Sequence, residues 1–93
     1  DIPEELSRIM EEKKEKEFQM AYQKGEDLYL IKGYGRQMSG GYSIQVTDLS
    51  ASVNAVFFET KLIGPTEEVQ GGEPSYPYIV VKTEYRDVPV QFQ

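Results

Sequence analysis

The chain has 93 residues, with 16 acidic and 10 basic side chains, a net charge of −6 and 39% hydrophobic residues. A chain of this length is expected to form one domain with one core. It contains no cysteine and no histidine, which excludes disulfides, thiolate or imidazole metal sites, and catalysis by a histidine of this chain. No apolar run approaches the roughly 20 residues of a membrane span. The acidic balance argues against nucleic acid as a partner, because phosphates attract basic surfaces.

The first segment, residues 1–17, has the composition of a helix, with seven acids, four bases and no glycine. Asp1 is positioned to cap the first turn. Leu6, Ile9 and Met10 share one face at three- and four-residue spacing, and a run of charged residues then ends this stripe. We therefore expect a solvated helix with a short docking edge. The alternative is a linker helix that spaces the domain from an upstream anchor.

The rest of the chain shows the two-residue period and the turn residues of β-strands. Strands are expected at 18–23, 28–32, 42–47, 53–63, 76–81 and 88–92, with turns at 24–27, 48–52 and 86–87. The strongly apolar segment 28–32 indicates a strand buried on both faces. Adjacent Phe57 and Phe58 indicate another such strand or a bulge. Pro89 confines the last strand to a sheet edge, and 18–22 is expected to form a second, less protected edge.

These elements predict a mainly β, α+β fold. An N-terminal charged helix, residues 1–17, precedes an antiparallel β domain, residues 18–93, and the whole chain forms a single domain. Short connections favour neighbouring antiparallel strands. We expect a five- to six-strand antiparallel sheet that curls into a sandwich or partial barrel, since two strands are apolar on both faces.

Candidate catalytic groups are few. A glycosidase needs two carboxylates about 5–9 Å apart on a rigid scaffold, and neither such a scaffold nor the spacing of a calcium-binding loop is visible. The acids considered are Glu59, Glu67, Glu68, Glu73 and Glu84. Ser39 lacks the Gly-x-Ser-x-Gly spacing of a nucleophile elbow. We therefore expect a protein that is not an enzyme and uses no metal or cofactor.

Two loops, 33–42 and 64–76, combine glycine or proline with tyrosine at their borders. Tyrosine supplies a large contact area at low entropic cost, and glycine lets a partner approach the backbone closely. We expect the loops to meet at one end of the sheet and to bind a partner. The candidate residues are Tyr34, Arg36, Met38, Ser39, Gly40, Gly41, Tyr42, Tyr76, Pro77 and Tyr78.

Tyr42 and Tyr78 are expected to point inward, whereas Tyr34 and Tyr76 are expected at the surface. A simpler interpretation is that all four rings cap the end of the core. Two other functions stay open. One is a small-ligand or carbohydrate-binding module that uses the same tyrosines as stacking platforms. The other is a structural spacer domain whose function is only to set a distance.

Two short motifs carry a family resemblance. Residues 39–46 read SGGYSIQV and residues 74–82 read PSYPYIVVK. In this order and spacing they resemble the C-terminal domain of the PrcB family, in which a Thr-Gly-Gly-Tyr segment leads one strand and a Tyr-Pro segment leads another. Ser39 stands where threonine is more usual and keeps the hydroxyl. The resemblance spans roughly Leu28 to Phe92.

The PrcB family takes its name from a subunit of a bacterial cell-surface protease complex. The resemblance therefore implies an extracellular or cell-envelope location, after removal of a signal segment. It also implies a non-catalytic module that binds or stabilises a protein partner, with an envelope protease as one candidate. The chain begins with Asp1 rather than Met, which is compatible with an upstream signal or lipid anchor. The resemblance assigns no functional residues, so the candidate residues rest on loop composition.

Overall fold

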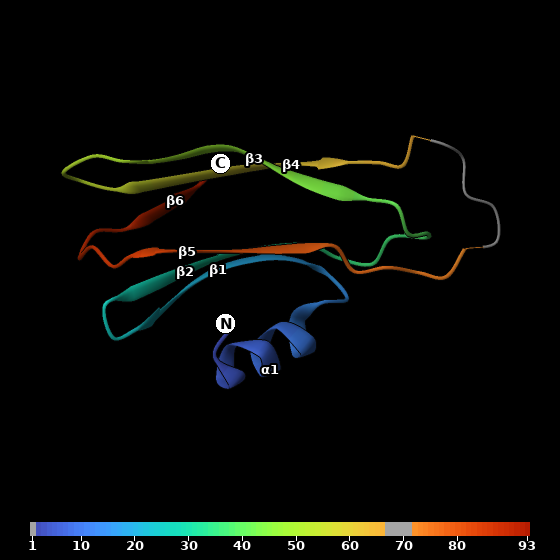
Figure 1. Cartoon of the computed structure of the whole chain (residues 1–93), viewed down its shortest axis with the longest axis horizontal. Coiled ribbons are helices and arrows are strands. Elements are labelled where there is room, and N and C mark those ends of the chain that lie inside the picture. The colour runs from blue at the N-terminus through green and yellow to red at the C-terminus, as the bar shows by residue number, and fades with distance from the viewer. Residues whose placement is uncertain (1, 67–71) are drawn as a thin grey trace.

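The protein is described from a computed structural model, in which residues 2–66 and 72–93 are described. In these residues one helix and six strands form three layers (Figure 1). The elements are α1 (Glu4–Lys13), β1 (Glu17–Lys24), β2 (Asp27–Tyr34), β3 (Ser43–Ala51), β4 (Val56–Ile63), β5 (Tyr78–Glu84) and β6 (Val90–Phe92). The predicted mainly β fold with an N-terminal helix is confirmed.

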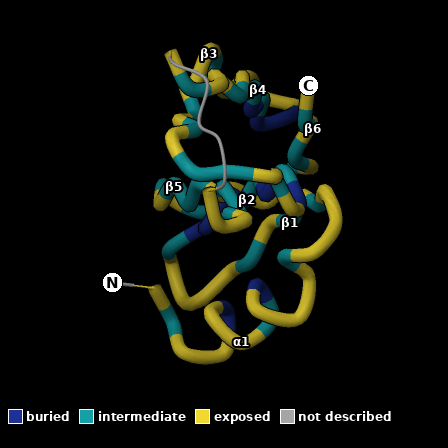
Figure 2. The backbone as a smooth tube through the Cα atoms, turned by 90° about the vertical axis from the view of Figure 1, so that its right-hand side faces the viewer, coloured by how far each residue is buried: buried dark blue, intermediate teal, exposed yellow. Residues whose placement is uncertain are grey.

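The strands divide between two three-stranded sheets. Sheet A has the order β1-β2-β5 and sheet B the order β3-β4-β6. Figure 2 shows sheet B stacked on one face of sheet A and α1 against the other face. In the described part of the chain neither sheet is closed or strongly curled, so no partial barrel forms, whereas the stacking of the two sheets corresponds to the sandwich that was the other predicted form. β1 and β6 lie at sheet edges, as predicted.

The pairing of β4 with β6 is parallel, with Val56 opposite Val90 and Phe58 opposite Phe92. The prediction of a wholly antiparallel domain is therefore wrong at this pair. After β4 the chain reverses into β5 of sheet A, and it reverses again before β6 (Figure 1). Two reversals restore the original direction, so a strand that returns to sheet B beside β4 has to run parallel to it.

β2 is the central strand of sheet A and is buried on both faces, as predicted. Successive side chains of a strand point to opposite faces, so β2 contributes alternately to two cores, and the expectation of one core is wrong. The core beneath α1 comprises Leu6, Met10, Tyr29 and Ile31, and the core between the sheets comprises Leu28, Leu30, Val56 and Phe58. Because burying each aliphatic side chain stabilises the fold by about 1.5–3 kcal/mol, β2 holds the three layers together.

α1 ends at Lys13, earlier than predicted, because the chain has to turn before β1 begins. Leu6 and Met10 are buried and Ile9 is half-buried, which confirms the apolar stripe and its short docking edge. Asp1, the predicted cap, lies outside the described residues. In the described ranges no helix has both the length and the apolar character needed to cross a membrane.

The turn between β3 and β4 lies later than predicted. Residues 48–51, expected as a turn, continue β3 after a bulge that follows Val46. The chain reverses at 52–55, where the Ser52 hydroxyl accepts hydrogen bonds from the backbone N–H groups of Asn54 and Ala55. Such serine-to-backbone bonds are typical of turns.

Candidate functional site

The two glycine- and tyrosine-containing loops meet at one end of the molecule, as predicted (Figure 1). The N–H of Gln37 donates to the Ser75 carbonyl at 2.8 Å, and the N–H of Ser75 donates to the Gln37 carbonyl at 3.0 Å. The Ser75 hydroxyl also donates to the Ser39 carbonyl, at 2.5 Å. Gly41 has a φ of 86° and lies against Pro65. We call this surface, formed by residues 35–42, 64–66 and 72–75, the loop end.

The ten predicted site residues fall into three places. Six belong to the loop end: Arg36, Met38, Ser39, Gly40, Gly41 and Tyr42. Three others lie beside a pocket on the side of the molecule: Tyr76, Pro77 and Tyr78. The tenth, Tyr34, lies between the sheets. Met38 is the most exposed of the large apolar side chains at the loop end, at 77%.

The orientations predicted for Tyr34 and Tyr78 are wrong. Tyr34 is half-buried, and its hydroxyl lies 2.5 Å from Oγ1 of Thr60 on β4, so it joins sheet A to sheet B. Tyr78 is 54% exposed. It lies on the same face of β5 as Val80, towards α1. Because β5 is an edge strand, α1 leaves a hollow beside Tyr78 instead of covering it.

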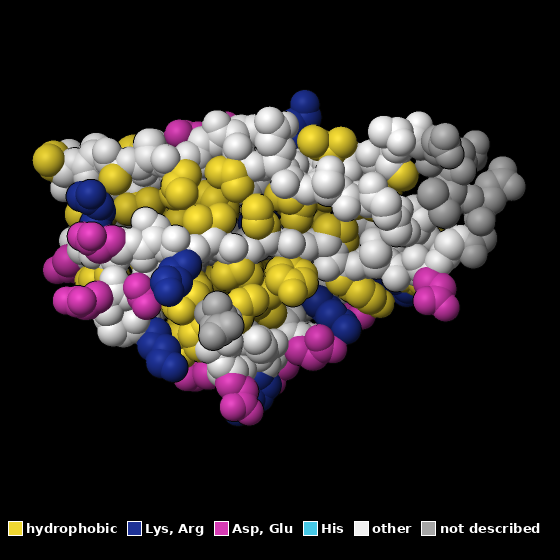
Figure 3. All heavy atoms as spheres, in the orientation of Figure 1, with side chains coloured by type: hydrophobic (Ala, Val, Ile, Leu, Met, Phe, Trp, Pro, Cys, Tyr) yellow, Lys and Arg dark blue, Asp and Glu magenta, His cyan; other side chains and the backbone are white. Residues whose placement is uncertain are grey.

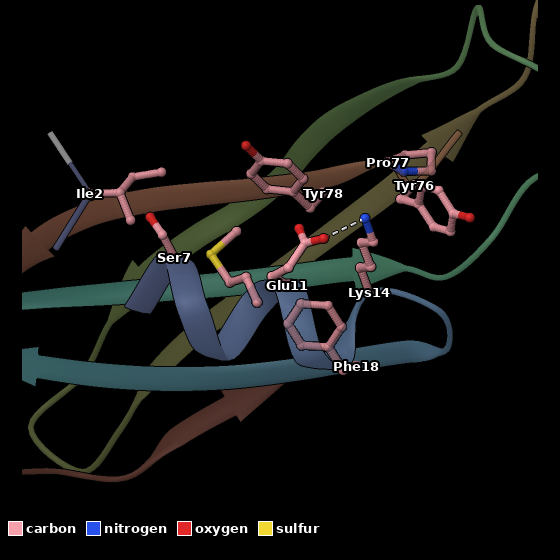
Figure 4. Close-up of a pocket in the computed structure, with 9 residues that line it drawn as sticks. Ile2, Ser7, Glu11, Lys14, Phe18, Tyr76, Pro77 and Tyr78 are labelled. Atoms are coloured by element: carbon pink, nitrogen blue, oxygen red, sulfur yellow. Dashed lines mark ion pairs between the residues drawn. The ribbon is translucent and has the colours of Figure 1, made fainter. Parts of the chain in front are cut away.

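That hollow is a pocket of about 370 Å³ between α1 and the start of β5 (Figure 4). Its apolar floor includes Met10 of α1, Phe18 of β1 and Tyr78 of β5. Gly33 of β2 pairs with both Phe18 and Tyr78 across sheet A. The Phe18 ring leans over Gly33, where a Cβ atom would collide with it. The missing side chain therefore lets an aromatic ring lie across the centre of the sheet.

The rim of the pocket carries one ion pair. Nζ of Lys14 lies 2.7 Å from Oε1 of Glu11 and 4.8 Å from the centroid of the Tyr76 ring (Figure 4). The hydrogen bond to Glu11 is the main cause that raises the pKa of Lys14, and the charges of Glu11 and Glu15 add to it. The ammonium is therefore charged at neutral pH. Since the Lys14 and Glu11 side chains are 36% and 71% exposed, water can compete for both.

Sequence reasoning did not assign the helix side of this pocket. The charged run that includes Glu11 and Lys14 predicts a solvated face, and Phe18 is predicted only as part of a strand. The alternation of Phe18, Met20 and Tyr22 does indicate one apolar face of β1. No local pattern, however, shows that α1 folds back onto that face and leaves the start of β5 uncovered.

The acidic residues that the structure describes do not assemble a metal centre. Within residues 2–66 and 72–93, no three acidic side chains lie close enough together to hold a metal ion. Glu59 accepts a hydrogen bond from Thr47 at 2.8 Å. Glu67 and Glu68, which we considered as candidate acids, lie outside the described residues.

A comparison with models of known protein families shows which family the chain belongs to. The family model described as PrcB C-terminal matches residues 28–84, which is well over half of the chain. The chain belongs to this family. The match to the PrcB C-terminal family covers β2 to β5, whereas α1, β1 and β6 lie outside it. The resemblance inferred from the SGGY and SYPY motifs is thus confirmed. No curated protein and no solved structure matches the chain.

The PrcB C-terminal match also divides the pocket. Tyr76, Pro77 and Tyr78 lie within the matched residues, whereas Glu11 of α1 and Lys14 just after α1, on the opposite side, precede them. The pocket is therefore built jointly by the family domain and by the N-terminal segment of this chain.

Proposed function

We propose that this chain is a non-catalytic protein-binding module of the bacterial cell envelope that presents its loop end to a protein partner. The envelope setting and an envelope protease as the candidate partner follow from the PrcB family, whose name refers to a subunit of a cell-surface protease complex. The absence of histidine and cysteine from the sequence supports a role that depends on contact rather than on reactive side chains.

The observation that carries the proposal is the pair of backbone hydrogen bonds between Gln37 and Ser75. These bonds hold two loops that are far apart in the sequence in one arrangement. The Gln37 side chain adds a bond to the Tyr34 carbonyl at 3.0 Å. A surface that is ordered before binding loses less conformational entropy when a partner docks, so these contacts favour a binding role.

The loop end also offers the chemistry that protein partners use. Met38 is 77% exposed, and methionine adapts its flexible side chain to irregular surfaces. Tyr42 is half-buried beside Gly40 and Gly41, where the backbone is open to close approach. An exposed methionine and a half-buried tyrosine next to accessible backbone form the kind of surface at which binding energy concentrates.

Apolar side chains continue from this end along the gap between the two sheets (Figure 3). On β3, Val46 and Leu49 are 37% and 42% exposed, although Leu49 pairs with the buried Phe58. Single exposed apolar residues are ordinary, whereas contiguous ones mark interaction surfaces. This band supports a partner that contacts the open side of the molecule as well as the loop end.

The loop end can be tested with two matched variants, Met38→Asp and Val53→Asp. Val53 is 90% exposed and lies in the turn between β3 and β4, at the opposite end of the molecule (Figure 1). Both variants place a carboxylate on an exposed apolar position, so both are expected to fold, which circular dichroism checks. Affinity capture from envelope extract with mass spectrometry is expected to lose the partner for Met38→Asp alone. Equal capture by both variants rejects this surface.

A second candidate function is small-ligand binding, which the pocket beside Tyr78 favours. Its volume of about 370 Å³ lies within the range of about 300–1,000 Å³ that ligand sites occupy. If this function is correct, Tyr78→Ala is expected to abolish binding of the small molecule, and Met38→Asp is expected to leave it unchanged.

A further inference from the structure

The pocket between α1 and β5 already holds a cation, the ammonium of Lys14. We infer that this pocket receives a lysine or arginine side chain from a basic segment of the protein partner, and that Lys14 occupies the cation position in the free protein. This inference rests on the proposed protein-binding function and names the chemistry that the partner has to supply.

Lys14 marks the position because two different groups stabilise its charge there. The Glu11 carboxylate accepts from Nζ at 2.7 Å, and the Tyr76 ring centroid lies 4.8 Å from Nζ. An ammonium within about 6 Å of an aromatic centroid is attracted by the ring quadrupole. A carboxylate beside an aromatic face is the combination that recognises ammonium and guanidinium groups.

The floor of the pocket suits the aliphatic stem of such a side chain. Phe18 and Tyr78 present aromatic surface (Figure 4), and Met10 of α1 also lines the pocket. Lysine and arginine bury their methylene groups along apolar surface while the charged end stays at a polar rim. An incoming side chain that crosses this floor can therefore place its charge beside Glu11.

Lys14 can leave the position readily. It follows the end of α1, its side chain is 36% exposed, and its partner Glu11 lies three residues earlier, in the last turn of the helix. Exposed ion pairs of this kind are weak because water solvates both partners. A partner that brings its own cation replaces the pair with Glu11, and Lys14 moves into solvent while it keeps its charge.

Charge complementarity selects a basic partner over an acidic one. The chain carries a net charge of −6, and Glu15 as well as Glu11 acts on the charge of Lys14. Once Lys14 has moved out, the rim is negative. An acidic segment would meet repulsion there, whereas a basic segment is attracted both over a distance and in the pocket.

The test uses the purified chain and two short peptides that differ by one charge, Ac-Gly-Lys-Gly-NH2 and the same peptide with norleucine in place of lysine. Binding is followed by NMR through the ring resonances of Phe18, Tyr76 and Tyr78. The lysine peptide is expected to shift these resonances, and the norleucine peptide to shift them far less. Equal binding of the two peptides would show an apolar pocket and overturn the inference.

Two variants test the role assigned to Lys14. Lys14→Ala removes the internal competitor and is expected to tighten binding of the lysine peptide about two- to fivefold, the scale of an exposed cation–π contact. Lys13→Ala is the matched control, because it changes the net charge equally at the neighbouring exposed residue. Equal effects of the two variants would mean that only net charge matters, and this would also overturn the inference.

Glu11→Gln completes the series. It keeps the shape of the side chain but removes the carboxylate charge, so binding of the lysine peptide is expected to weaken about two- to fivefold. Unchanged binding contradicts the inference. These peptide measurements are independent of partner capture. If Met38→Asp loses the partner while the lysine peptide fails to bind, the proposed function stands and the cation site is rejected.

Discussion

The ring of Phe18 on β1 covers Gly33 on β2, its partner in the register of sheet A. A Cβ atom built on Gly33 would overlap three atoms of that ring. Glycine is therefore required here by the close approach of an aromatic ring, and the same contact forms the floor of the pocket beside Tyr78. One missing side chain thus serves both the packing of the sheet and the shape of the candidate site.

Gly33→Ala is expected to lower the free energy of unfolding by about 1–3 kcal/mol, because the added methyl group has to displace the Phe18 ring. Urea denaturation followed by circular dichroism measures the change. Gly40→Ala is the control, since a Cβ atom at Gly40 meets no heavy atom of the described chain within 4 Å. Equal urea midpoints for Gly33→Ala and Gly40→Ala would contradict the close approach of the Phe18 ring to Gly33.

The hydrogen bond between Tyr34 and Thr60 is expected to contribute to the joining of the two sheets. Its oxygen atoms lie 2.5 Å apart in a half-buried position. Tyr34→Phe is expected to cost about 0.5–1.5 kcal/mol of unfolding free energy, the usual net value of such a bond. In a double-mutant cycle with Thr60→Val, the double variant is expected to lose less than the sum of the single losses. Strictly additive losses would mean that the two hydroxyls do not interact.

The contact of α1 with β1 predicts a displaced tyrosine titration. The Tyr22 hydroxyl donates to Oε2 of Glu5 at 2.8 Å, and this bond is the main cause that raises the pKa of Tyr22 above its ordinary 10.0. Because the folded pKa exceeds the unfolded one, the contribution to stability is complete below about pH 10 and is lost as the pH rises through the folded pKa.

NMR or absorbance titration of the tyrosines tests this relation. Glu5→Gln is expected to lower the pKa of Tyr22 towards its ordinary value, because the charged acceptor is gone. Tyr85 is an internal control, since burial is the main cause that raises its pKa and Asp87 is its charged neighbour. If Glu5→Gln leaves the pKa of Tyr22 unchanged, that result contradicts the hydrogen bond between Tyr22 and Glu5.

Phe57 and Phe58 offer a comparison of the two faces of β4. Phe58 is 1% exposed in the core between the sheets, and its ring meets the Phe92 ring edge-on with 6.1 Å between the ring centroids. Phe57 is only half-buried on the outer face. Phe58→Ala is expected to cost about 3–5 kcal/mol, and Phe57→Ala clearly less. Thermal or urea unfolding measures both. A larger loss at Phe57 would place the core on the other face of sheet B.

Sequence reasoning succeeded where the pattern is local and repeated. The stripe of Leu6 and Met10 does dock, the apolar run of β2 is buried on both faces, and the segment after Pro89 is an edge strand. It failed where a distant segment decides the outcome. The orientation of Tyr34 depends on Thr60, a residue 26 positions later that supplies its hydrogen-bond partner.

Periodicity and composition predict which segments form the helix and the strands, because they express local backbone geometry, and the sequence shows that histidine and cysteine are absent. The division of six strands between two sheets, the parallel direction of β6 beside β4 and the meeting of the Glu11–Lys14 pair with Tyr76 are visible only in the folded chain. They follow from no local pattern because an apolar face can be buried against several different partners. The choice among them depends on the packing of the whole chain, which no single segment contains.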